Sequence, residues 1–277
     1  MIADRVHSIL KENKLFAKKK FGQNFLLDKN ILNKIVEISE VNSNDTIIEI
    51  GPGLGCLTEF LAMQAKKVIC YEIDKDMVEI LKDNLSSYNN IEIIHMDFLK
   101  ADLSIYNNPC DNVKVVANLP YYITTPIIFK LLSETQIKQF TFMVQKEVGE
   151  RLTGKPNTKD YNALSVVMNY KTDSKLAYKV SRNSFHPAPN VESALLVVKT
   201  KEVDSSGNFG PKFLEFVQNI FEQRRKTIIN NISNNYSISK DKLMKIFEEN
   251  NISIDIRAEA LDIEQIKQIY ILLKSNL

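Results

Sequence analysis

The amino-acid sequence predicts an α/β protein with a mostly parallel sheet, followed by a small domain made of helices. Up to residue 199, short apolar segments rich in β-branched residues alternate with helix-like segments, which is typical of βαβ units. Beyond residue 211 only helical spacing recurs. The chain has 277 residues, 44% of them apolar, which is enough for one large domain and an appended one.

Seven segments are predicted to form the sheet. The first five are short apolar runs between helix-like segments, and the last two are expected to end the sheet as an antiparallel pair. The predicted strands are residues 46–50, 68–72, 91–95, 114–117, 140–144, 176–180 and 194–199.

Helical spacing of apolar residues predicts the helices. Asp28 is suited to cap one helix, and another is expected to follow Tyr161. Three more patterns lie beyond residue 211, the last two at residues 242–249 and 264–273. The residues expected to face inward are Ile31, Leu32, Ile35 and Ile38, then Leu164, Val167 and Met168, and then Phe213, Phe216, Val217, Ile220 and Phe221.

The clearest break in the pattern is residues 201–211, KEVDSSGNFGP, because Ser, Gly, Asn and Pro gather there after the last predicted strand. We therefore predict one domain over residues 1–205 and a small helical domain over residues 206–277. The basic residues 224–226 are placed on the first helix of the second domain. Neighbours on a helix are about 100° apart, so these three cations cannot all face one way.

Composition excludes several classes of protein. No segment approaches the roughly 18 consecutive apolar residues of a membrane span, and the first 14 residues carry charges where a signal peptide is apolar. A cytoplasmic protein is expected. Cys56, Cys70 and Cys110 form no CxxC pair, which argues against a disulfide framework and a zinc ribbon, so no metal site is predicted.

The net charge of +2 is too small to indicate nucleic-acid binding by itself. Basic residues are nevertheless concentrated in two segments. Residues 1–22 hold six basic and two acidic side chains, and residues 146–182 hold eight basic and four acidic ones. Such concentrations fit a polyanionic partner and also fit a solvated face, and both alternatives stay open.

A glycine-rich turn follows the first predicted parallel strand and leads into a helix. Gly51 and Gly53 allow a ligand to approach the backbone closely where the N–H groups at the start of the helix point outward. Cys56 stands where the dinucleotide fingerprint has Gly or Ala. That departure weakens the interpretation as a nicotinamide oxidoreductase.

Carboxylates end the next two predicted strands. Glu72 lies 21 residues after Gly51, close to the spacing of roughly 20 at which an acid accepts both ribose hydroxyls. Asp97 is placed to accept a hydrogen bond from the exocyclic amine of an adenine, although an isolated residue of this kind is more often a helix cap. Ligands of open α/β sheets bind at the carboxyl ends of the strands, so a nucleoside site is predicted there.

The tetrapeptide Asn118, Leu119, Pro120 and Tyr121 follows the strand predicted at residues 114–117. An adenine N6 is a poor nucleophile because its lone pair is delocalised into the ring. The Asn118 side-chain oxygen and the Leu119 carbonyl, held rigid before a proline, can each accept one N6 hydrogen and direct the lone pair toward a methyl donor. The Tyr121 ring offers a face on which a flipped base can stack.

These motifs resemble those of the ribosomal RNA adenine N6-dimethyltransferases. The similarity extends from residue 20 to residue 261, and its last three motifs look like the branch that methylates 16S ribosomal RNA. Tyr122 stands where the family more often has a polar residue such as Asn. The matching motifs are KFGQNFL at 20–26, EIGPGLG at 49–55, NLPY at 118–121, FHPAPNVESA at 185–194, QRRKT at 223–227 and RAEAL at 257–261.

The resemblance implies a Rossmann-like class I methyltransferase sheet with a small C-terminal α-helical domain, and S-adenosylmethionine as the cofactor. It implies that Tyr121 and Phe185 lie on either side of the target adenine. The implied cofactor residues are Asn24 and Leu26 over the cofactor, Gly51 and Gly53 at its methionine end, Glu72 on the ribose, Asp97 on the adenine, and Asn118 between cofactor and base. The implied catalytic residues are Asn118, Leu119, Tyr121 and Phe185.

The implied reaction is dimethylation of the N6 amines of two adjacent adenosines in a hairpin loop near the 3′ end of 16S ribosomal RNA. The expected partner is a partly assembled small ribosomal subunit, with no membrane, and the expected enzyme is a monomer. Three alternatives remain. They are a large-subunit adenine methylase that confers macrolide resistance, a ribosome-assembly factor that acts mainly by binding, and a nicotinamide oxidoreductase.

Overall fold

The computed structural model describes residues 4, 6, 8, 9, 11, 24–108, 112–134, 137–201 and 209–275. The chain divides into two compact units. Unit 1 is Met1–Gly149 with Lys175–Thr200, and unit 2 is Glu150–Ser174 with Lys201–Leu277. Residue 206, where the domain boundary is expected, lies outside the described residues, as do Cys110 and most of the basic segment 1–22.

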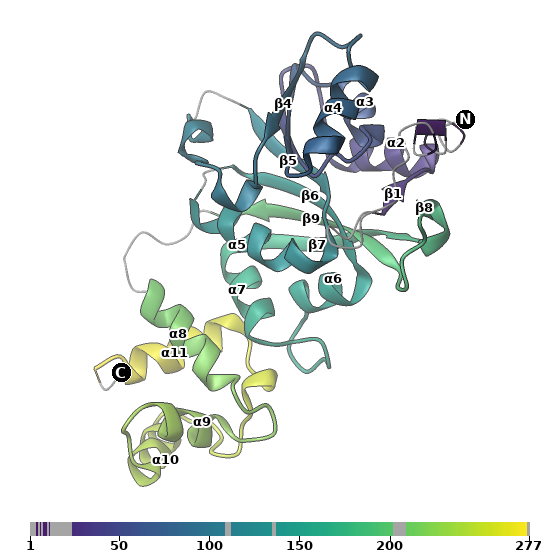
Figure 1. Ribbon diagram of the computed structural model, residues 1–277. Coiled ribbons are helices and arrows are strands. Elements are labelled where there is room, and N and C mark those ends of the chain that lie inside the picture. Colours follow the sequence, from purple (N-terminus) through teal and green to yellow (C-terminus); the bar gives the residue numbers. More distant parts are fainter. Residues whose placement is uncertain are drawn as a thin grey trace. The chain divides into compact units, whose positions relative to one another are not determined.

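A seven-stranded sheet with the order β4-β3-β2-β5-β6-β9-β7 forms the centre of unit 1 (Figure 1). The five strands β2 to β6 run parallel, and β9 runs antiparallel to β6. The last two predicted strands, now β7 and β9, lie side by side at the edge of the sheet. The strands are β2 (Thr46–Ile50), β3 (Lys67–Glu72), β4 (Ile91–His95), β5 (Val113–Asn118), β6 (Gln139–Gln145), β7 (Thr172–Val180) and β9 (Ser193–Thr200). All seven predicted strands are confirmed, with bounds that differ by four residues at most.

The strand order creates a crevice in the middle of the sheet. From β2 the chain adds β3 and β4 on one side, and it then adds β5 and β6 on the other side. At such a reversal the loops after β2 and β5 leave in opposite directions, which opens a binding site at the carboxyl ends of these two strands. The glycine turn follows β2, and Asn118 is the last residue of β5.

Helices connect the strands of unit 1. Asp28 caps α2, its carboxylate accepting hydrogen bonds from the backbone N–H groups of Asn30 and Ile31, as the sequence predicted. Helix α3 packs against α2 and β3, and α4 packs against β3 and β4. The bounds are α2 (Lys29–Ile38), α3 (Cys56–Ala62), α4 (Lys75–Asn84), η2 (Phe98–Lys100), η3 (Ser104–Tyr106), η4 (Tyr121–Ile123), α5 (Thr124–Glu134), α6 (Lys146–Leu152) and η5 (Arg182–Ser184).

A second, two-stranded sheet in unit 1 was not predicted. Strand β1 (Phe25–Leu26) pairs antiparallel with β8 (Phe185–His186), so that Leu26 lies opposite Phe185. Phe25, Leu26 and Phe185 are all buried in the hydrophobic core that also holds the inward face of α2. The β1–β8 ribbon thus brings residues 25 and 26 into contact with residues 185 and 186, far along the chain.

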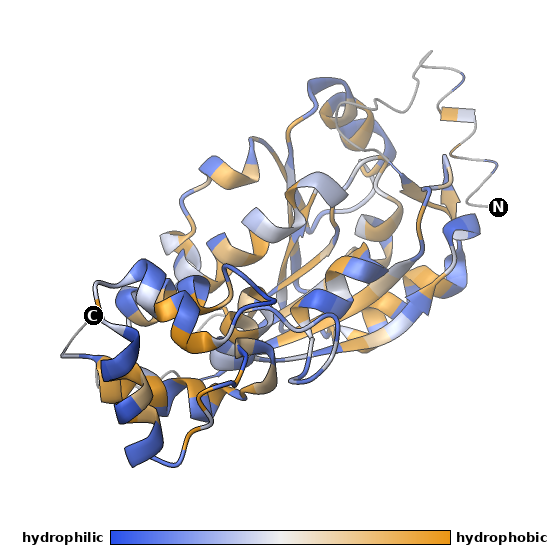
Figure 2. Cartoon of the chain, turned by 90° about the horizontal axis from the view of Figure 1, so that it is seen from below, coloured by the Kyte–Doolittle hydropathy of each residue, from blue (hydrophilic) through white to orange (hydrophobic). Residues whose placement is uncertain are grey.

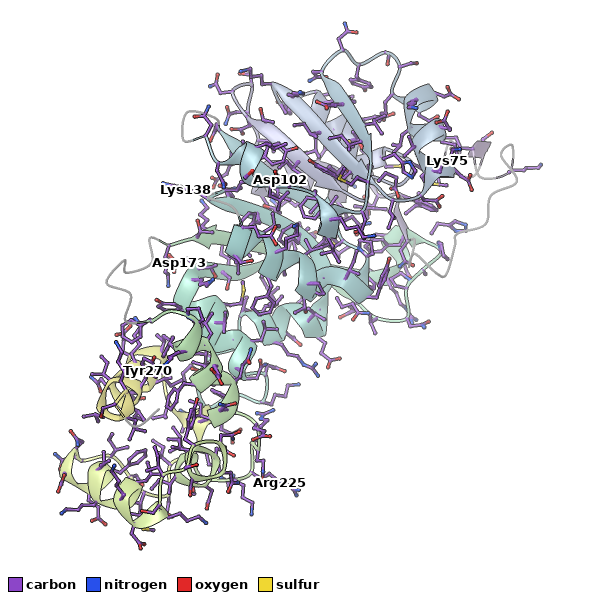
Figure 3. All side chains as sticks on the ribbon, turned by 60° about the vertical axis from the view of Figure 1, so that its left-hand side comes forward. Lys75, Asp102, Lys138, Asp173, Arg225 and Tyr270 are labelled. Atoms are coloured by element: carbon purple, nitrogen blue, oxygen red, sulfur yellow. The ribbon has the colours of Figure 1, made fainter. Side chains whose placement is uncertain are left out.

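Unit 2 is helical around an aromatic core, and α7 contributes Tyr170 to it. The ring of Phe213 meets the rings of Tyr170 and Tyr270 edge to face, with centroids 5.4 Å and 5.3 Å away. Orange and blue residues alternate along these helices in Figure 2, as amphipathic helices require, and Figure 3 labels Tyr270 within this unit. The bounds are α7 (Ala163–Lys171), α8 (Pro211–Ile220), α9 (Ile228–Asn235), α10 (Lys240–Glu249), η6 (Ala258–Ala260) and α11 (Ile263–Leu273). Helix α9 was not predicted.

The placement of residues 224–226 on a helix was wrong. Helix α8 ends at Ile220, and the hydroxyl of Thr227 accepts a hydrogen bond from the Asn230 N–H to begin α9, so the basic residues lie in the turn between two helices. Arg224 pairs with Glu259 at 3.0 Å. Arg225 extends away from the helices in Figure 3.

The described residues include no helix that is both long and apolar enough to cross a membrane. Within the same part of the chain, no three His, Cys, Asp or Glu side chains gather into a metal site. Cys56 and Cys70 are buried, and neither forms a disulfide within the described part of the chain.

Candidate active site

A cavity of about 270 Å³ opens at the carboxyl ends of β2, β3, β4 and β5, where the strand order reverses. It lies entirely within unit 1. The site residues expected from the sequence that line it are Asn24, Leu26, Gly51, Gly53, Glu72, Asp97, Asn118, Leu119 and Tyr121. The structure therefore brings together side chains that are spread over almost 100 residues of sequence.

The glycine turn forms one wall of the cavity. Gly51 and Gly53 have φ angles of +67° and +59°, in the left-handed region that L side chains rarely adopt. A Cβ atom on Gly53 would lie 3.2 Å from the ring of Phe25 in β1. The turn therefore requires glycine both for its backbone conformation and for the close approach of β1.

Glu72 lies at the carboxyl end of β3 and is 5% exposed. Its two carboxylate oxygens accept hydrogen bonds from the backbone N–H groups of Gly53, at 3.3 Å, and Asp74, at 2.8 Å. Burial raises the pKa of this carboxyl. The two backbone donors fix the carboxylate beside the glycine turn, where the sequence placed a ribose acceptor.

Glu49 also lines the cavity and was not identified as a site residue from the sequence. It lies in β2, is 1% exposed, and burial raises its pKa to about 8, with the charge of Glu72 adding to the shift. The thiol of Cys70 lies 3.8 Å from its carboxyl. A charged residue inside the otherwise apolar strand TIIEI was the available signal, because buried carboxyls without a compensating charge are rare outside functional sites.

Asp97 is half-buried at the end of β4. One of its carboxylate oxygens accepts a hydrogen bond from the Leu99 N–H at 3.0 Å and so caps the short helix η2. The side chain also lines the cavity. The sequence left two roles open for Asp97, a helix cap and a residue of the nucleoside site. In the structure Asp97 caps a helix and also lines the cavity proposed for the nucleoside.

Asn118 is held so that its amide has a defined orientation. Its Nδ2 donates a hydrogen bond to the backbone carbonyl of Asn24 at 3.1 Å. The side-chain oxygen of an amide points away from the nitrogen, so this bond leaves the oxygen of Asn118 available as an acceptor. The next residue is fixed as well, because the Leu119 N–H donates to the Met143 carbonyl in β6 at 3.2 Å and the following Pro120 restricts the backbone.

Tyr121 begins the 3₁₀ turn η4 at the rim of the cavity. Its hydroxyl lies 2.6 Å from the hydroxyl of Ser193 in β9, and burial raises its pKa. Tyr122 also lines the cavity but is 57% exposed, and its pKa is raised by burial and by the charges of Asp97 and Glu72. Tyr122, which stands where the family more often has a polar residue, thus lies in the wall of the cavity.

Phe185 is the expected site residue that the structure does not bring to the cavity. It is 4% exposed and packs in the hydrophobic core with Phe25 and Leu26, because β8 pairs with β1 and buries the ring. The expected position of this ring opposite Tyr121 remains a prediction.

Of the two basic segments, Lys18, Lys19 and Lys20 lie outside the described residues. In the second segment, Lys175, Lys179 and Arg182 are exposed on β7 and η5 of unit 1. Their exposure is compatible with both alternatives, a polyanionic partner and a solvated face.

Proteins of known identity resemble this chain over most of its length. The Ribosomal RNA small subunit methyltransferase A of Geobacillus sp. (strain WCH70) is 44% identical over 270 residues, which are 94% of this chain and 93% of that protein. The protein of the same name from Bacillus cereus (strain B4264) is 45% identical over 271 residues, which are 95% of this chain and 93% of that protein.

Two solved structures share the fold. A dimethyladenosine transferase from Plasmodium falciparum superposes with a TM-score of 0.75 and 27% identity, covering 90% of this chain and 97% of that one. The 23S rRNA methyltransferase ErmE superposes with a TM-score of 0.71 and 27% identity, covering 91% of this chain and 100% of that one. The predicted Rossmann-like class I methyltransferase fold is therefore confirmed.

A family model described as Ribosomal RNA adenine dimethylase matches residues 14–275. This range includes every strand of the sheet and every residue that lines the cavity. The chain belongs to the ribosomal RNA adenine dimethylase family.

Proposed function

We propose that this enzyme transfers methyl groups from S-adenosylmethionine to the N6 amines of two adjacent adenosines in a hairpin loop near the 3′ end of 16S ribosomal RNA. The observation that carries the proposal is the fixed amide of Asn118 at the edge of the cavity. The substrate is a partly assembled small ribosomal subunit in the cytoplasm, and the enzyme acts as a monomer.

The cavity fits a nucleoside cofactor. The buried carboxylate of Glu72 would accept hydrogen bonds from the ribose hydroxyls, Asp97 would accept one from the adenine amine, and the open backbone at Gly51 would face the methionine end. Leu26 in β1 and Asn24, the residue directly before β1, line one wall of the cavity. S-adenosylmethionine supplies the methyl group as an electrophile on a positively charged sulfur.

The protein groups hold the amine in the geometry of the transition state. The Asn118 oxygen and the Leu119 carbonyl each accept one N6 hydrogen, which draws the nitrogen toward a tetrahedral shape and directs its lone pair at the donor. With the cofactor bound, methyl transfer would form an N–C bond at N6 while the S–C bond of the donor breaks, and N6 would lose one proton to solvent. Because both acceptors are fixed before the substrate arrives, little reorganisation is needed during the reaction.

The target base stacks on Tyr121, whose ring stands at the cavity rim. Stacking of a base on an aromatic side chain contributes about 1–3 kcal/mol. A base that is flipped out of its helix needs such a partner, because it loses the stacking of its neighbours. Phe185 is the proposed second ring.

A large-subunit methylase is the second candidate, because ErmE has nearly the same fold. The relatives named small subunit methyltransferase are 44% and 45% identical to this chain, whereas ErmE is 27% identical. The higher identity supports the small subunit as the substrate. A ribosome-assembly factor that acts mainly by binding would not need methyl transfer for its role. An inactive variant that still binds small subunits tests this alternative.

The decisive experiment is transfer of labelled methyl groups from S-adenosylmethionine to purified small and large ribosomal subunits that lack the modification. We expect labelled dimethyladenosine in the small subunit alone. Label in the large subunit would support the second candidate, and no label in either would refute the proposal. Asn118→Ala should bind small subunits with near-normal affinity and lose methyl transfer, because the amide acts along the path to the transition state.

A further inference from the structure

The hydroxyl of Tyr121 is held by a residue far along the chain. Ser193, the first residue of β9, is 0% exposed, and its hydroxyl lies 2.6 Å from that of Tyr121. Ser193 lies opposite Gln145, the last residue of β6, so it stands at the same carboxyl edge of the sheet as the cavity. The bond crosses from the loop after β5 over β6 to β9.

The two ends of the Tyr121 side chain are both fixed. At the backbone end, the Pro120 carbonyl accepts hydrogen bonds from the N–H of Ile123 and the hydroxyl of Thr124, which hold the turn that carries Tyr121. At the far end, the hydroxyl is bonded to Ser193. These two restraints fix the position of the ring at the cavity, because moving the ring about the Cα–Cβ bond would break the bond between Tyr121 and Ser193.

A stacking ring benefits from such a restraint. A mobile aromatic side chain loses conformational freedom when a base stacks on it, whereas a fixed ring has lost that freedom on folding. Ser193 is 0% exposed, so water competes little for its hydroxyl, which favours the bond to Tyr121 over solvation.

We propose that Ser193 is a positioning residue that holds the ring of Tyr121 in the place required to receive the target adenine. This inference rests on the proposed function, in which Tyr121 stacks on the base. Ser193 acts through Tyr121, because the hydroxyl contact is to the phenol at the rim and Ser193 itself does not line the cavity.

A double-mutant cycle tests the inference with the full-length protein. Ser193→Ala, Tyr121→Phe and the double variant are compared in single-turnover methylation of unmodified small subunits with labelled S-adenosylmethionine. Each single change should slow methylation at subsaturating subunit by about two- to tenfold, the cost of ordering one side chain on binding. The double variant should be no slower than either single variant, because both remove the same bond. Affinity for S-adenosylmethionine, measured by calorimetry, should stay unchanged.

Ser39→Ala is the matched control. Ser39 is also 0% exposed in unit 1, and its hydroxyl donates to the Ile35 carbonyl at 2.6 Å, but it does not line the cavity. It should lose stability comparable to Ser193→Ala and keep the normal methylation rate. If the effects of Ser193→Ala and Tyr121→Phe multiply, or if Ser39→Ala slows methylation equally, the positioning role is overturned.

Tyr121→Ala separates this inference from the proposed function. If Tyr121→Ala slows methylation strongly while Ser193→Ala and Tyr121→Phe are silent, the inference fails and the stacking role stands. If Tyr121→Ala leaves the rate normal, the stacking role fails and the positioning role falls with it.

Discussion

Replacing Glu49 by Gln should change how the stability of the protein depends on pH. The carboxyl of Glu49 is 1% exposed in β2, and burial raises its pKa from 4.5 to about 8. In the unfolded chain the carboxyl is solvated, and its pKa returns to the ordinary value. A Gln side chain has nearly the same shape as the protonated acid and cannot ionise, so this substitution isolates the contribution of the proton.

The size and sign of the effect follow from the shift. Each pKa unit corresponds to about 1.4 kcal/mol, so a shift from 4.5 to about 8 corresponds to at most about 5 kcal/mol. Between these two pH values, folded Glu49 keeps a proton that the unfolded chain has lost. The contribution of Glu49 is therefore fully present below pH 4.5, declines as the pH rises toward 8, and does not change further above it.

The measurement is urea unfolding of the wild-type protein and Glu49→Gln between pH 5 and pH 9. As the pH rises to 8, the free energy of unfolding of Glu49→Gln should increase by several kcal/mol relative to that of the wild type. Above pH 8 the difference between the two proteins should stay constant. Glu79→Gln removes a carboxyl whose side chain is 65% exposed and should keep the wild-type profile. Parallel profiles for wild type and Glu49→Gln would refute the assignment of a protonated, buried carboxyl.

Three further predictions concern the cofactor, the target base and RNA. Glu72→Gln should weaken S-adenosylmethionine binding by about 1.5–3 kcal/mol in calorimetry, since a charge-assisted acceptor is lost, and unchanged affinity in a folded variant would remove Glu72 from the site. Phe185→Ala should cost about 3–5 kcal/mol of stability, as for any buried Phe, while Phe185→Leu should stay folded, bind the cofactor normally and lose stacking energy in methylation. A Leu variant that makes normal dimethyl product would leave Phe185 only a packing role. Replacing the exposed Lys175, Lys179 and Arg182 by Ala should lower the salt dependence of RNA binding by up to about 0.7–0.9 log units per lost contact, and an unchanged slope would assign them to a solvated face.

The sheet and most of the cavity could be predicted because local sequence determines them. Each central strand is a short apolar run, and the residue or turn that faces the ligand follows it directly, as Gly51 follows β2 and Asn118 ends β5. The parallel arrangement then brings the carboxyl ends of these strands to one edge without further information. Glu49 was missed because the strand sequence shows only an acid within an apolar run, whereas its raised pKa depends on burial from all sides.

The β1–β8 ribbon could not be predicted because neither strand is long enough to show a period. Each has two residues, and their pairing depends on contacts between segments about 160 positions apart. The error at residues 224–226 had a local cause, because α8 ends at Ile220 and the hydroxyl of Thr227 begins a separate helix, α9. Short pairings and competing caps are decided by tertiary contacts and by single hydrogen bonds.

The ribbon links the two halves of the proposed mechanism. The Asn24 carbonyl, directly before β1, orients the amide of Asn118, and Phe25 in β1 lies against the glycine turn that would hold the cofactor. Phe185 pairs with Leu26 and packs in the same core, so it supports β1 from the far side of the ribbon. Phe185→Ala, which removes most of this packing, should therefore weaken cofactor binding and turn the Asn118 amide at the same time. The buried position of Phe185 thus gives it an influence on methylation even through contacts that do not reach the base.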